Sequence, residues 1–333
     1  MTTSPTLTLE AIVAAVEQGY GLSVSSCDPL ELGHDAAARS WRIETPTGSW
    51  FLKLRAGTEA PRGALTPAYL GRRGVLGVIA PALTRGGLPY AHVGAFTVIV
   101  FPMLEVTQAA ETGLPRGGWR RFGEIVRAFH DLPAPPVDRL DLAHETFVPW
   151  RRELISPLRE VAERGSDDPI MRRFSASWRA HEDEIDTLVA ETDARGAAFR
   201  TRSHREVVCH TDLHTWNVLV DRDAGLWIVD WDEAMLAPRE RDLMFVTGGG
   251  LRRGLVSDED TDAFLEGYGD VDLDGALLDH YRMARAVEDI AAWGEEIALR
   301  PGASEAERRE SLSFFDLLFE PGDNVDLALA AIR

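Results

Sequence analysis

The chain has 333 residues, of which 45% are hydrophobic and 27% are charged, an ordinary composition for a folded globular protein. This length exceeds what one small core needs and predicts two lobes or domains. The net charge of −19 argues against nucleic acid and anionic lipid as partners, because both would be repelled, and it suits either a cationic ligand or simple solubility.

The sequence predicts a cytoplasmic protein without a membrane partner. Cys27 and Cys209 have no CxxC spacing, so they predict neither a disulfide framework nor a zinc knuckle and fit a reducing compartment. The first twenty residues lack the basic and apolar regions of a secretory signal. The longest apolar run, from Val93 to Leu104, is too short to span a bilayer. We further expect the protein to act as a monomer.

The first hundred residues predict a β-rich region. In chain order we expect a helix over 8–18 with Thr8 as its N-cap, a hairpin of strands 40–44 and 50–54 around a turn at 45–48, a short helix near 64–76 and a buried strand over 96–101. After residue 104 helical periodicity dominates, apart from a β-like segment at 207–230. Two apolar helical faces are predicted there, one formed by Trp119, Phe122, Ile125, Val126 and Phe129, the other by Ile170, Phe174, Trp178, His181, Ile185 and Leu188.

This pattern predicts an α+β protein of two lobes with a cleft between them. The small β-rich lobe is expected over residues 1–104 and the larger, mainly helical lobe over 105–333.

Lys53 is the only lysine among 35 basic residues, and it lies on the returning strand of the predicted hairpin. A lysine ammonium is a compact charge on a flexible stem, whereas an arginine guanidinium is a planar fork that keeps its charge. A lysine at this one position suggests a need for an ammonium that can meet a phosphate. A bias toward arginine in the genome would explain the same count without any function.

A second polar group is predicted at the hairpin formed by residues 218–229. If its loop has four residues, 222–225, Asn217 lies opposite Asp230, with Asp212 on the loop that precedes them. Magnesium prefers such amide and carboxylate oxygens and keeps water or substrate phosphates as its other ligands. A divalent ion would also relieve the repulsion between crowded carboxylates.

The order of these residues is that of phosphoryl transfer in protein-kinase-like enzymes. The segment His210-Thr211-Asp212-Leu213-His214-Thr215-Trp216-Asn217 resembles the H-G-D-x-H-x-x-N loop of the aminoglycoside phosphotransferase family of antibiotic kinases. Ile228-Val229-Asp230-Trp231-Asp232 resembles its I-D-W-D strand end, and Ala237-Pro238-Arg239-Glu240-Arg241-Asp242-Leu243 its G-P-x-x-x-D-L continuation. The resemblance is densest over residues 207–290 and is nearest to the spectinomycin branch of the family.

The resemblance implies a two-lobe kinase fold and an ATP- or GTP-dependent transfer to a hydroxyl of a small cationic aminocyclitol, giving antibiotic resistance. Asp212 would act as the base toward that hydroxyl. Asn217 and Asp230 would hold Mg²⁺, and Lys53 would hold the nucleotide phosphates. Further nucleotide contacts are expected from Gly33, His34 and Asp35 in the phosphate loop and from Phe101 and Met103 at the junction of the lobes.

Several residues depart from the family pattern or have two interpretations. Thr211 stands where the family usually has glycine, and Trp216 where it usually has a small residue. Trp216 could narrow the entry to Asp212 or pack beneath the loop, and we expect the packing. The lysine of kinases usually pairs with a glutamate on a helix, and Glu59 is the only acid between Lys53 and Glu105.

Asp232, Glu233 and Glu266 are candidates for binding a cationic substrate, although each could be solvated surface and Asp232 could cap a turn. His210 and His214 are expected to brace the loop.

Three other functions remain open at this stage. Choline, homoserine or sugar kinases share the fold. A metal-dependent hydrolase could use His210, Asp212, His214 and Asp230 as ligands, but it would leave Lys53 without a role. A catalytically silent nucleotide-binding scaffold is disfavoured by the complete set of polar residues.

Overall fold

The computed structural model describes residues 8–30, 38–136, 140–248, 250–252 and 255–332. Contacts along the chain separate it into two compact units, one made of residues 1–143 and 210–236, the other of residues 144–209 and 237–333. The chain therefore passes between the units three times. The predicted boundary between two lobes, after residue 104, does not coincide with the ends of these units. The division into lobes stays a prediction.

In its described residues, the first unit combines two sheets with three helices and two very short helical segments. Its elements are α1 (Leu9–Tyr20), β1 (Ser26–Leu30), β2 (Ala38–Thr45), β3 (Gly48–Ala56), α2 (Arg62–Arg72), β4 (Ala91–Val93), β5 (Phe96–Pro102), β6 (Val106–Gln108), α3 (Ala109–Thr112), α4 (Arg116–His130), the 3-10 turn η2 (Thr215–Asn217), β8 (Val218–Asp221) and β9 (Leu226–Ile228). Thr8 caps α1 as predicted, because its hydroxyl accepts a hydrogen bond from the Ala11 backbone N–H at 3.3 Å.

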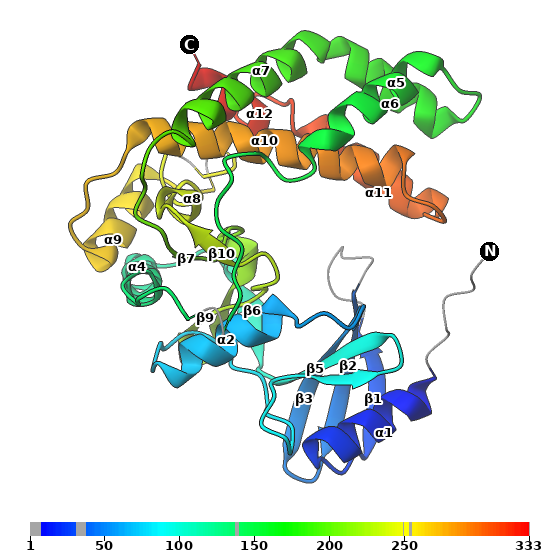
Figure 1. Ribbon diagram of the computed structural model, residues 1–333, viewed down its shortest axis with the longest axis vertical. Helices are drawn as coiled ribbons and strands as arrows, with labels where there is room; N and C mark the ends of the chain where they lie inside the picture. The colour runs from blue at the N-terminus through cyan, green and yellow to red at the C-terminus, as the bar shows by residue number, and fades with distance from the viewer. Residues whose placement is uncertain (1–7, 31–37, 137–139, 249, 253–254, 333) are drawn as a thin grey trace. The chain divides into compact units, whose positions relative to one another are not determined.

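Five antiparallel strands form the larger sheet in the order β1-β2-β3-β5-β4. Figure 1 shows this sheet with α1 alongside it. Leu52 and Leu54 of β3 are buried on one face, where α1 packs with Ile12 and Val16. Since successive strand residues point to opposite faces, Lys53 projects from the other face. The predicted hairpin is confirmed, and Ser40 lies opposite Lys53.

The smaller sheet has the order β6-β8-β9 and carries the second half of the predicted site. It is tied to the rest of the unit at Gly77, whose carbonyl accepts the Ile228 backbone N–H at 2.8 Å. Gly77 has a positive φ of 80°, and a Cβ there would lie 2.4 Å from Ile125 Cδ1 of α4. Glycine is therefore required for the close contact among this loop, α4 and β9. The apolar face predicted for α4 is buried throughout.

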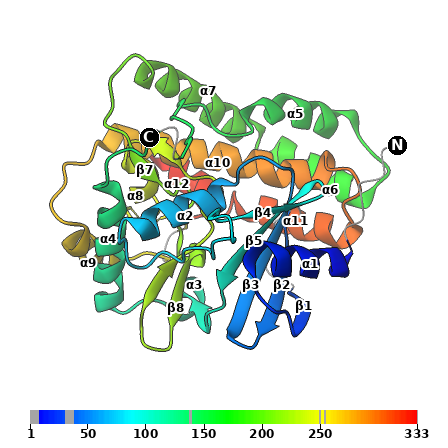
Figure 2. The same ribbon diagram turned by 60° about the horizontal axis from the view of Figure 1, so that its bottom comes forward.

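The second unit is helical. Its elements are η1 (Arg152–Leu154), α5 (Ile155–Arg164), α6 (Pro169–Ala180), α7 (Glu182–Phe199), β7 (Val207–Cys209), α8 (Glu240–Leu243), α9 (Asp258–Tyr268), α10 (Gly275–Ala298), α11 (Glu305–Leu317) and α12 (Asn324–Ala330). The strand β10 (Met235–Ala237) spans the point where the chain enters this unit for the second time. The long helix α10 runs alongside α7 (Figure 2), and its residues form the middle of one core with Leu158, Phe174 and Phe315.

The second apolar face predicted from the sequence is wrong in one respect. Residues 170–188 do not form one helix, because the helical geometry breaks at His181, which has φ −116° and ψ 14° and separates α6 from α7. The His181 ring stacks on Phe319 at 4.0 Å between centroids, and α7 begins with three acidic residues, which suit the positive end of a helix dipole. The α+β class itself is confirmed. In the described part of the chain no helix is both long and apolar enough to cross a membrane.

Candidate active site

The loop of residues 210–217 is held by its two histidines and by Thr211. The buried His210 ring places Nε2 2.7 Å from the Val229 carbonyl oxygen, so this loop is joined to the end of the β8–β9 hairpin. Thr211 has a positive φ of 74°, a region that favours glycine, which explains why the related loops have glycine there. Its hydroxyl donates to the Glu233 carbonyl at 3.1 Å and helps to hold this conformation.

Asp212 is the focus of this loop. The Asn217 amide nitrogen Nδ2 donates to the Asp212 carbonyl oxygen at 2.8 Å and to its carboxylate oxygen Oδ2 at 3.0 Å. His214 Nε2 lies 3.2 Å from the other carboxylate oxygen, Oδ1. The Asp212 side chain remains 26% exposed. Its carboxylate is therefore oriented from two sides and still reachable by a small molecule. His214 contacts the acid directly, which the sequence did not indicate.

The hairpin register differs from the prediction by one residue. Val218 lies opposite Ile228, Leu219 opposite Trp227 and Val220 opposite Leu226, whereas the prediction paired Val218 with Val229. Asn217 therefore faces Val229, whose backbone N–H donates to the Asn217 carbonyl oxygen at 3.0 Å. Asp230 is the next residue after this pair, not the direct partner of Asn217.

A shorter loop causes the shift. The Asp221 N–H bonds to the Gly225 carbonyl at 3.0 Å, which leaves three loop residues instead of four. Ala224 takes the left-handed conformation at φ 59°, a known arrangement for three-residue hairpin loops. The Asp221 carboxylate then accepts hydrogen bonds from the backbone N–H groups of Asp223 and Gly225 and from the Trp227 indole.

Lys53 lies between two carboxylates that follow the hairpin. Its Nζ is 3.1 Å from Asp230 Oδ1 and 2.7 Å from Asp232 Oδ2. The other oxygen of Asp232, Oδ1, is 3.0 Å from the Arg55 guanidinium. Asp230 has a positive φ of 65°, a region that is uncommon for residues other than glycine but that aspartate adopts more readily than most. Four charged side chains from β3 and from the segment after β9 thus form one group.

The protonation of Lys53 follows from two opposed effects. Burial disfavours the charged ammonium, but the carboxylates of Asp230 and Asp232 outweigh it and raise the pKa of Lys53 above its ordinary value. The ammonium is therefore fully charged at neutral pH.

The structure places the other predicted residues in different surroundings. Gly33, His34 and Asp35 lie outside the described residues. Glu59 is exposed, and the carboxylates that contact Lys53 are those of Asp230 and Asp232 instead.

Phe101 lies on β5 opposite Phe51, with ring centroids 6.3 Å apart, and the Met103 N–H donates to the Ser49 carbonyl at 3.1 Å. Both side chains are half-buried beside β3.

The predicted substrate residues do not share one environment. Glu233 is exposed on the segment after Asp232, and Glu266 is exposed on α9 of the second unit. Asp232 is 15% exposed, and both its oxygens are engaged by Lys53 and Arg55. It caps no turn, and its carboxylate is not open to a cationic substrate. Arg55 was missed, although its spacing of two residues from Lys53 places both on the same face of β3.

Trp216 does not pack beneath the loop, and this expectation is wrong. Its side chain is 48% exposed, and the Gln108 side-chain amide of β6 donates to its backbone carbonyl at 3.2 Å. The turn η2 directs Asn217 toward Asp212, while the preceding residue faces solvent.

A catalytic metal bound by the histidines finds no support in the geometry. Within the described residues, His210, Asp212, His214 and Asp230 do not bring ligand atoms within 4.8 Å of one another as a group. His210 Nε2 is already engaged with a backbone carbonyl.

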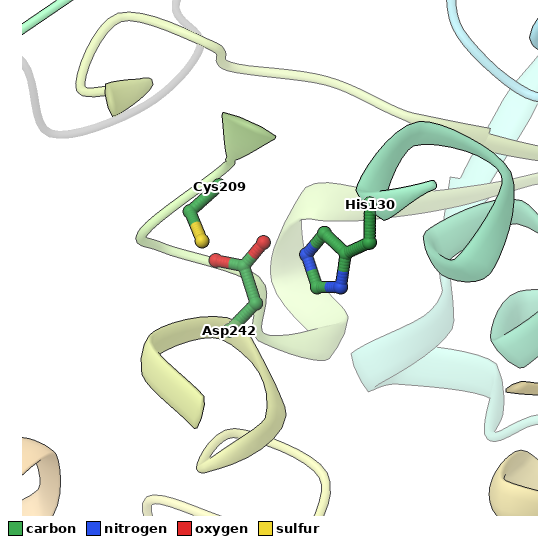
Figure 3. Close-up of side chains that lie close together, drawn as sticks. All are labelled: His130, Cys209 and Asp242. Atoms are coloured by element: carbon green, nitrogen blue, oxygen red, sulfur yellow. The ribbon is translucent and has the colours of Figure 1, made fainter. Parts of the chain in front are cut away.

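Cys209 is not a reactive thiol. Figure 3 shows its sulfur facing the carboxylate of Asp242, a residue of the same unit. Burial and then this neighbouring charge raise the pKa of the Cys209 thiol well above its ordinary value. Its Sγ lies 3.5 Å from the carbonyls of Ala237 and Pro238.

Comparison with known proteins settles the family. Residues 29–286 match the sequence model described as the phosphotransferase enzyme family, APH. The chain belongs to this family. Its members are small-molecule kinases with a protein-kinase-like fold, which confirms both the predicted fold and the predicted class of enzyme. A search of curated protein sequences finds no significant match.

Solved structures add a nearer likeness. Spectinomycin phosphotransferase APH(9)-Ia in complex with ADP and spectinomycin is 27% identical, with a TM-score of 0.83 over 99% of each chain. The AMP-bound complex of the same enzyme is 26% identical, with a TM-score of 0.82 over 98% of this chain and 100% of that one. A choline/ethanolamine kinase family protein from Mesorhizobium loti, 17% identical over 97% and 98% of the two chains with a TM-score of 0.55, shares the fold.

Proposed function

We propose that this phosphotransferase moves the γ-phosphoryl group of ATP to a hydroxyl of a small cationic aminocyclitol, with spectinomycin as the first candidate. The observation that carries this proposal is the likeness to spectinomycin phosphotransferase along 99% of both chains, together with the Lys53, Asp212, Asn217 and Asp230 set. The net charge of −19 suits a cationic substrate. Phosphorylation of such a drug would give resistance.

Asp212 is the proposed base toward the substrate hydroxyl. Asn217 Nδ2 and His214 Nε2 fix its carboxylate from two sides, at 3.0 and 3.2 Å. A carboxylate held in this way can accept a hydrogen bond from the hydroxyl, aim its oxygen at the γ-phosphorus and receive its proton as the new P–O bond forms. The leaving group of this transfer is ADP.

The donor set fits a magnesium ion. Asp230 offers a carboxylate whose side chain is 49% exposed. Asn217, the residue before the β8–β9 hairpin, offers the oxygen of its side-chain amide. Oxygen donors in small number are what Mg²⁺ takes from proteins. The ion would neutralise charge on the nucleotide phosphates. In the presence of the nucleotide, Lys53 would turn its ammonium toward those phosphates.

The proposal is tested by a coupled ADP-release assay on the purified protein. ATP or GTP with Mg²⁺ is offered together with spectinomycin, other aminocyclitols, aminoglycosides, choline, homoserine or simple sugars, and Asp212→Ala serves as the blank. We expect ATP-dependent turnover with spectinomycin at the highest kcat/KM, abolished by chelation of magnesium.

A response to choline alone would overturn the substrate class and keep the reaction. An absence of ADP release with every acceptor would overturn the proposed function. Preference for GTP would change only the nucleotide.

A further inference from the structure

The two carboxylates beside Lys53 differ in how firmly the protein holds them. Asp230 is 49% exposed and meets Lys53 at 3.1 Å, whereas Asp232 is 15% exposed and meets it at 2.7 Å. Asp232 also binds Arg55 at 3.0 Å, so each of its oxygens has its own cation. Ion pairs are screened less when water is kept away from them. Asp230 can therefore exchange its partner more readily than Asp232.

The first turn of α2 lies directly against Asp232. A Cβ added at Gly63, the second residue of α2, would lie 1.8 Å from Asp232 Oδ1 and 2.9 Å from its Cγ. No side chain other than the hydrogen of glycine leaves the carboxylate where it is. The sequence of α2, Arg62-Gly63-Ala64-Leu65-Thr66-Pro67-Ala68-Tyr69-Leu70-Gly71-Arg72, contains no acidic residue. This helix gives Lys53 no carboxylate of its own and leaves room for one from elsewhere.

We propose that Asp232 is the residue that positions Lys53 and that Asp230 is the partner that can be exchanged. Asp232 can reach the lysine because Gly63 has no side chain in the space that the carboxylate occupies. Asp232 holds the ammonium in place, with Arg55 balancing its second oxygen. When nucleotide arrives, Asp230 leaves the lysine and Asp232 stays. The last step rests on the proposed function; the pairing of Asp232 with Lys53 through Gly63 does not.

The chain offers a direct probe, because Lys53 is its only lysine. Isotope labelling at the lysine ε-carbon, in protein without a lysine-bearing tag, gives one side-chain NMR signal, whose chemical shift and line width report the surroundings and the mobility of Lys53 alone. A lysine held by Asp232 at 2.7 Å should give a signal displaced from that of a free lysine. Loss of the Asp232 contact should move the signal toward the free position.

Two variants and one matched control test the pairing. Gly63→Ala adds a methyl group against the carboxylate. Gly117→Ala adds the same group at the second residue of α4, where no heavy atom lies within 4 Å of the new Cβ. Alanine favours both helices over glycine, so neither change weakens them intrinsically. Asp232→Asn removes the charge at nearly constant shape.

We expect Gly63→Ala and Asp232→Asn to shift the lysine signal toward that of a free lysine and to narrow it, and Gly117→Ala to leave the signal unchanged. Affinity for magnesium nucleotide, measured by titration calorimetry, should weaken by about tenfold in the first two variants, the order expected for a lost coupled contact. In the native chain, magnesium nucleotide should shift the lysine signal.

An unchanged lysine signal in both Gly63→Ala and Asp232→Asn would overturn the inference. Failure of the native chain to bind magnesium nucleotide would instead overturn the proposed function, while the lysine signals of the variants would still decide the role of Asp232. If Gly63→Ala did not fold, the lysine signal of Asp232→Asn would by itself support or overturn the pairing.

Discussion

Each unit of this protein contains a group of charged side chains, and the two groups differ in how much water they meet. The site group of the first unit consists of Lys53, Arg55, Asp230 and Asp232. The core group of the second unit consists of Glu145, Arg241 and Glu288. Arg241 lies 3.2 Å from Glu145 and 3.3 Å from Glu288, with only 2% of the Glu145 side chain exposed. Asp230 of the site group is 49% exposed.

The carboxylates of the core group find partners within the protein, although the buried Arg241 Nε has no hydrogen-bond partner among the described residues. Glu145 accepts the Phe147 backbone N–H at 2.6 Å and Glu288 that of Trp150 at 3.0 Å. Burial lowers the pKa of Arg241, but the two carboxylates outweigh it and raise the pKa above its ordinary range. Such a group stabilises the fold and exposes little of its charge to a ligand. In the site group, by contrast, the Asp230 side chain is 49% exposed to water. This exposure distinguishes a charge cluster that can bind a ligand from one that stabilises the fold.

The largest expected effect comes from breaking the core group. Arg241→Met should lower the free energy of unfolding by about 3 to 5 kcal/mol, because it leaves two buried carboxylates without their cation. Chemical denaturation measured by circular dichroism would test this. A loss below about 1 kcal/mol would mean that water already compensates these charges, and the contrast between the two groups would fail.

The next effect concerns His280, a buried residue of α10 in the same unit. Burial lowers the pKa of His280 from 6.5 to about 4, so between these values the unfolded chain binds a proton that the folded chain does not. The free energy of unfolding should therefore fall as the pH decreases through this window, by about 3 kcal/mol in all. His280→Phe keeps a ring beside Phe147 and Phe199 and should remove this part of the pH dependence. Identical slopes in denaturation series from pH 7 to pH 4 would contradict the assignment.

The site group and its neighbour Asp212 should respond in activity and not in stability. Asp212→Ala should lower kcat by about 100-fold or more, as loss of a positioned base does, while magnesium nucleotide still binds. Turnover in the ADP-release assay and nucleotide affinity by calorimetry would separate the two quantities. Turnover near that of the native chain would remove Asp212 from the proposed mechanism.

The smallest effect is expected at a fully hydrated pair. Arg222 and Glu105 lie 2.6 Å apart with side chains 81% and 73% exposed. Arg222→Met, the same replacement as at Arg241, should change the free energy of unfolding by less than about 0.5 kcal/mol. A loss comparable to that of Arg241→Met would show that exposure does not govern the value of an ion pair in this protein.

Elements with strong local patterns could be predicted from the sequence. The hairpin around Thr45 and Gly48, the capped helix α1 and the buried face of α4 each depend on residues close in the chain. The helix break at His181 could not be predicted, because no proline or glycine marks it. The His181 ring stacks on Phe319, a residue distant in the sequence, and this contact is visible only in the structure. The register of the β8–β9 hairpin depended on a three-residue loop with Ala224, and not the adjacent Gly225, in the left-handed region.

For the candidate site, residue types were predictable and pairings were not. The motif around residue 212 identified Asp212, Asn217 and Asp230 as neighbours on a loop and a hairpin. The sequence left the partner of Lys53 open, with the nearby Glu59 as one candidate, whereas the structure supplies Asp232, separated from Lys53 by 179 residues. Nothing local to either residue indicates that contact. Gly63 is the relevant residue, because the Asp232 carboxylate occupies the space where its side chain would be. This can be recognised only in the structure.

The threefold passage of the chain between its units has a consequence for biosynthesis. The five-stranded sheet is complete by residue 102, yet Asp230 follows Lys53 by 177 residues. At a ribosomal rate of about 5 to 20 residues per second, the 128 residues between Pro102 and Asp230 take about 6 to 26 s to synthesise, and the N-terminal sheet waits that long for the hairpin that completes its unit. During that interval the surface that receives β8 and β9 is uncovered on the nascent polypeptide. The first unit therefore stays incomplete while residues 144–209 of the second unit are being synthesised.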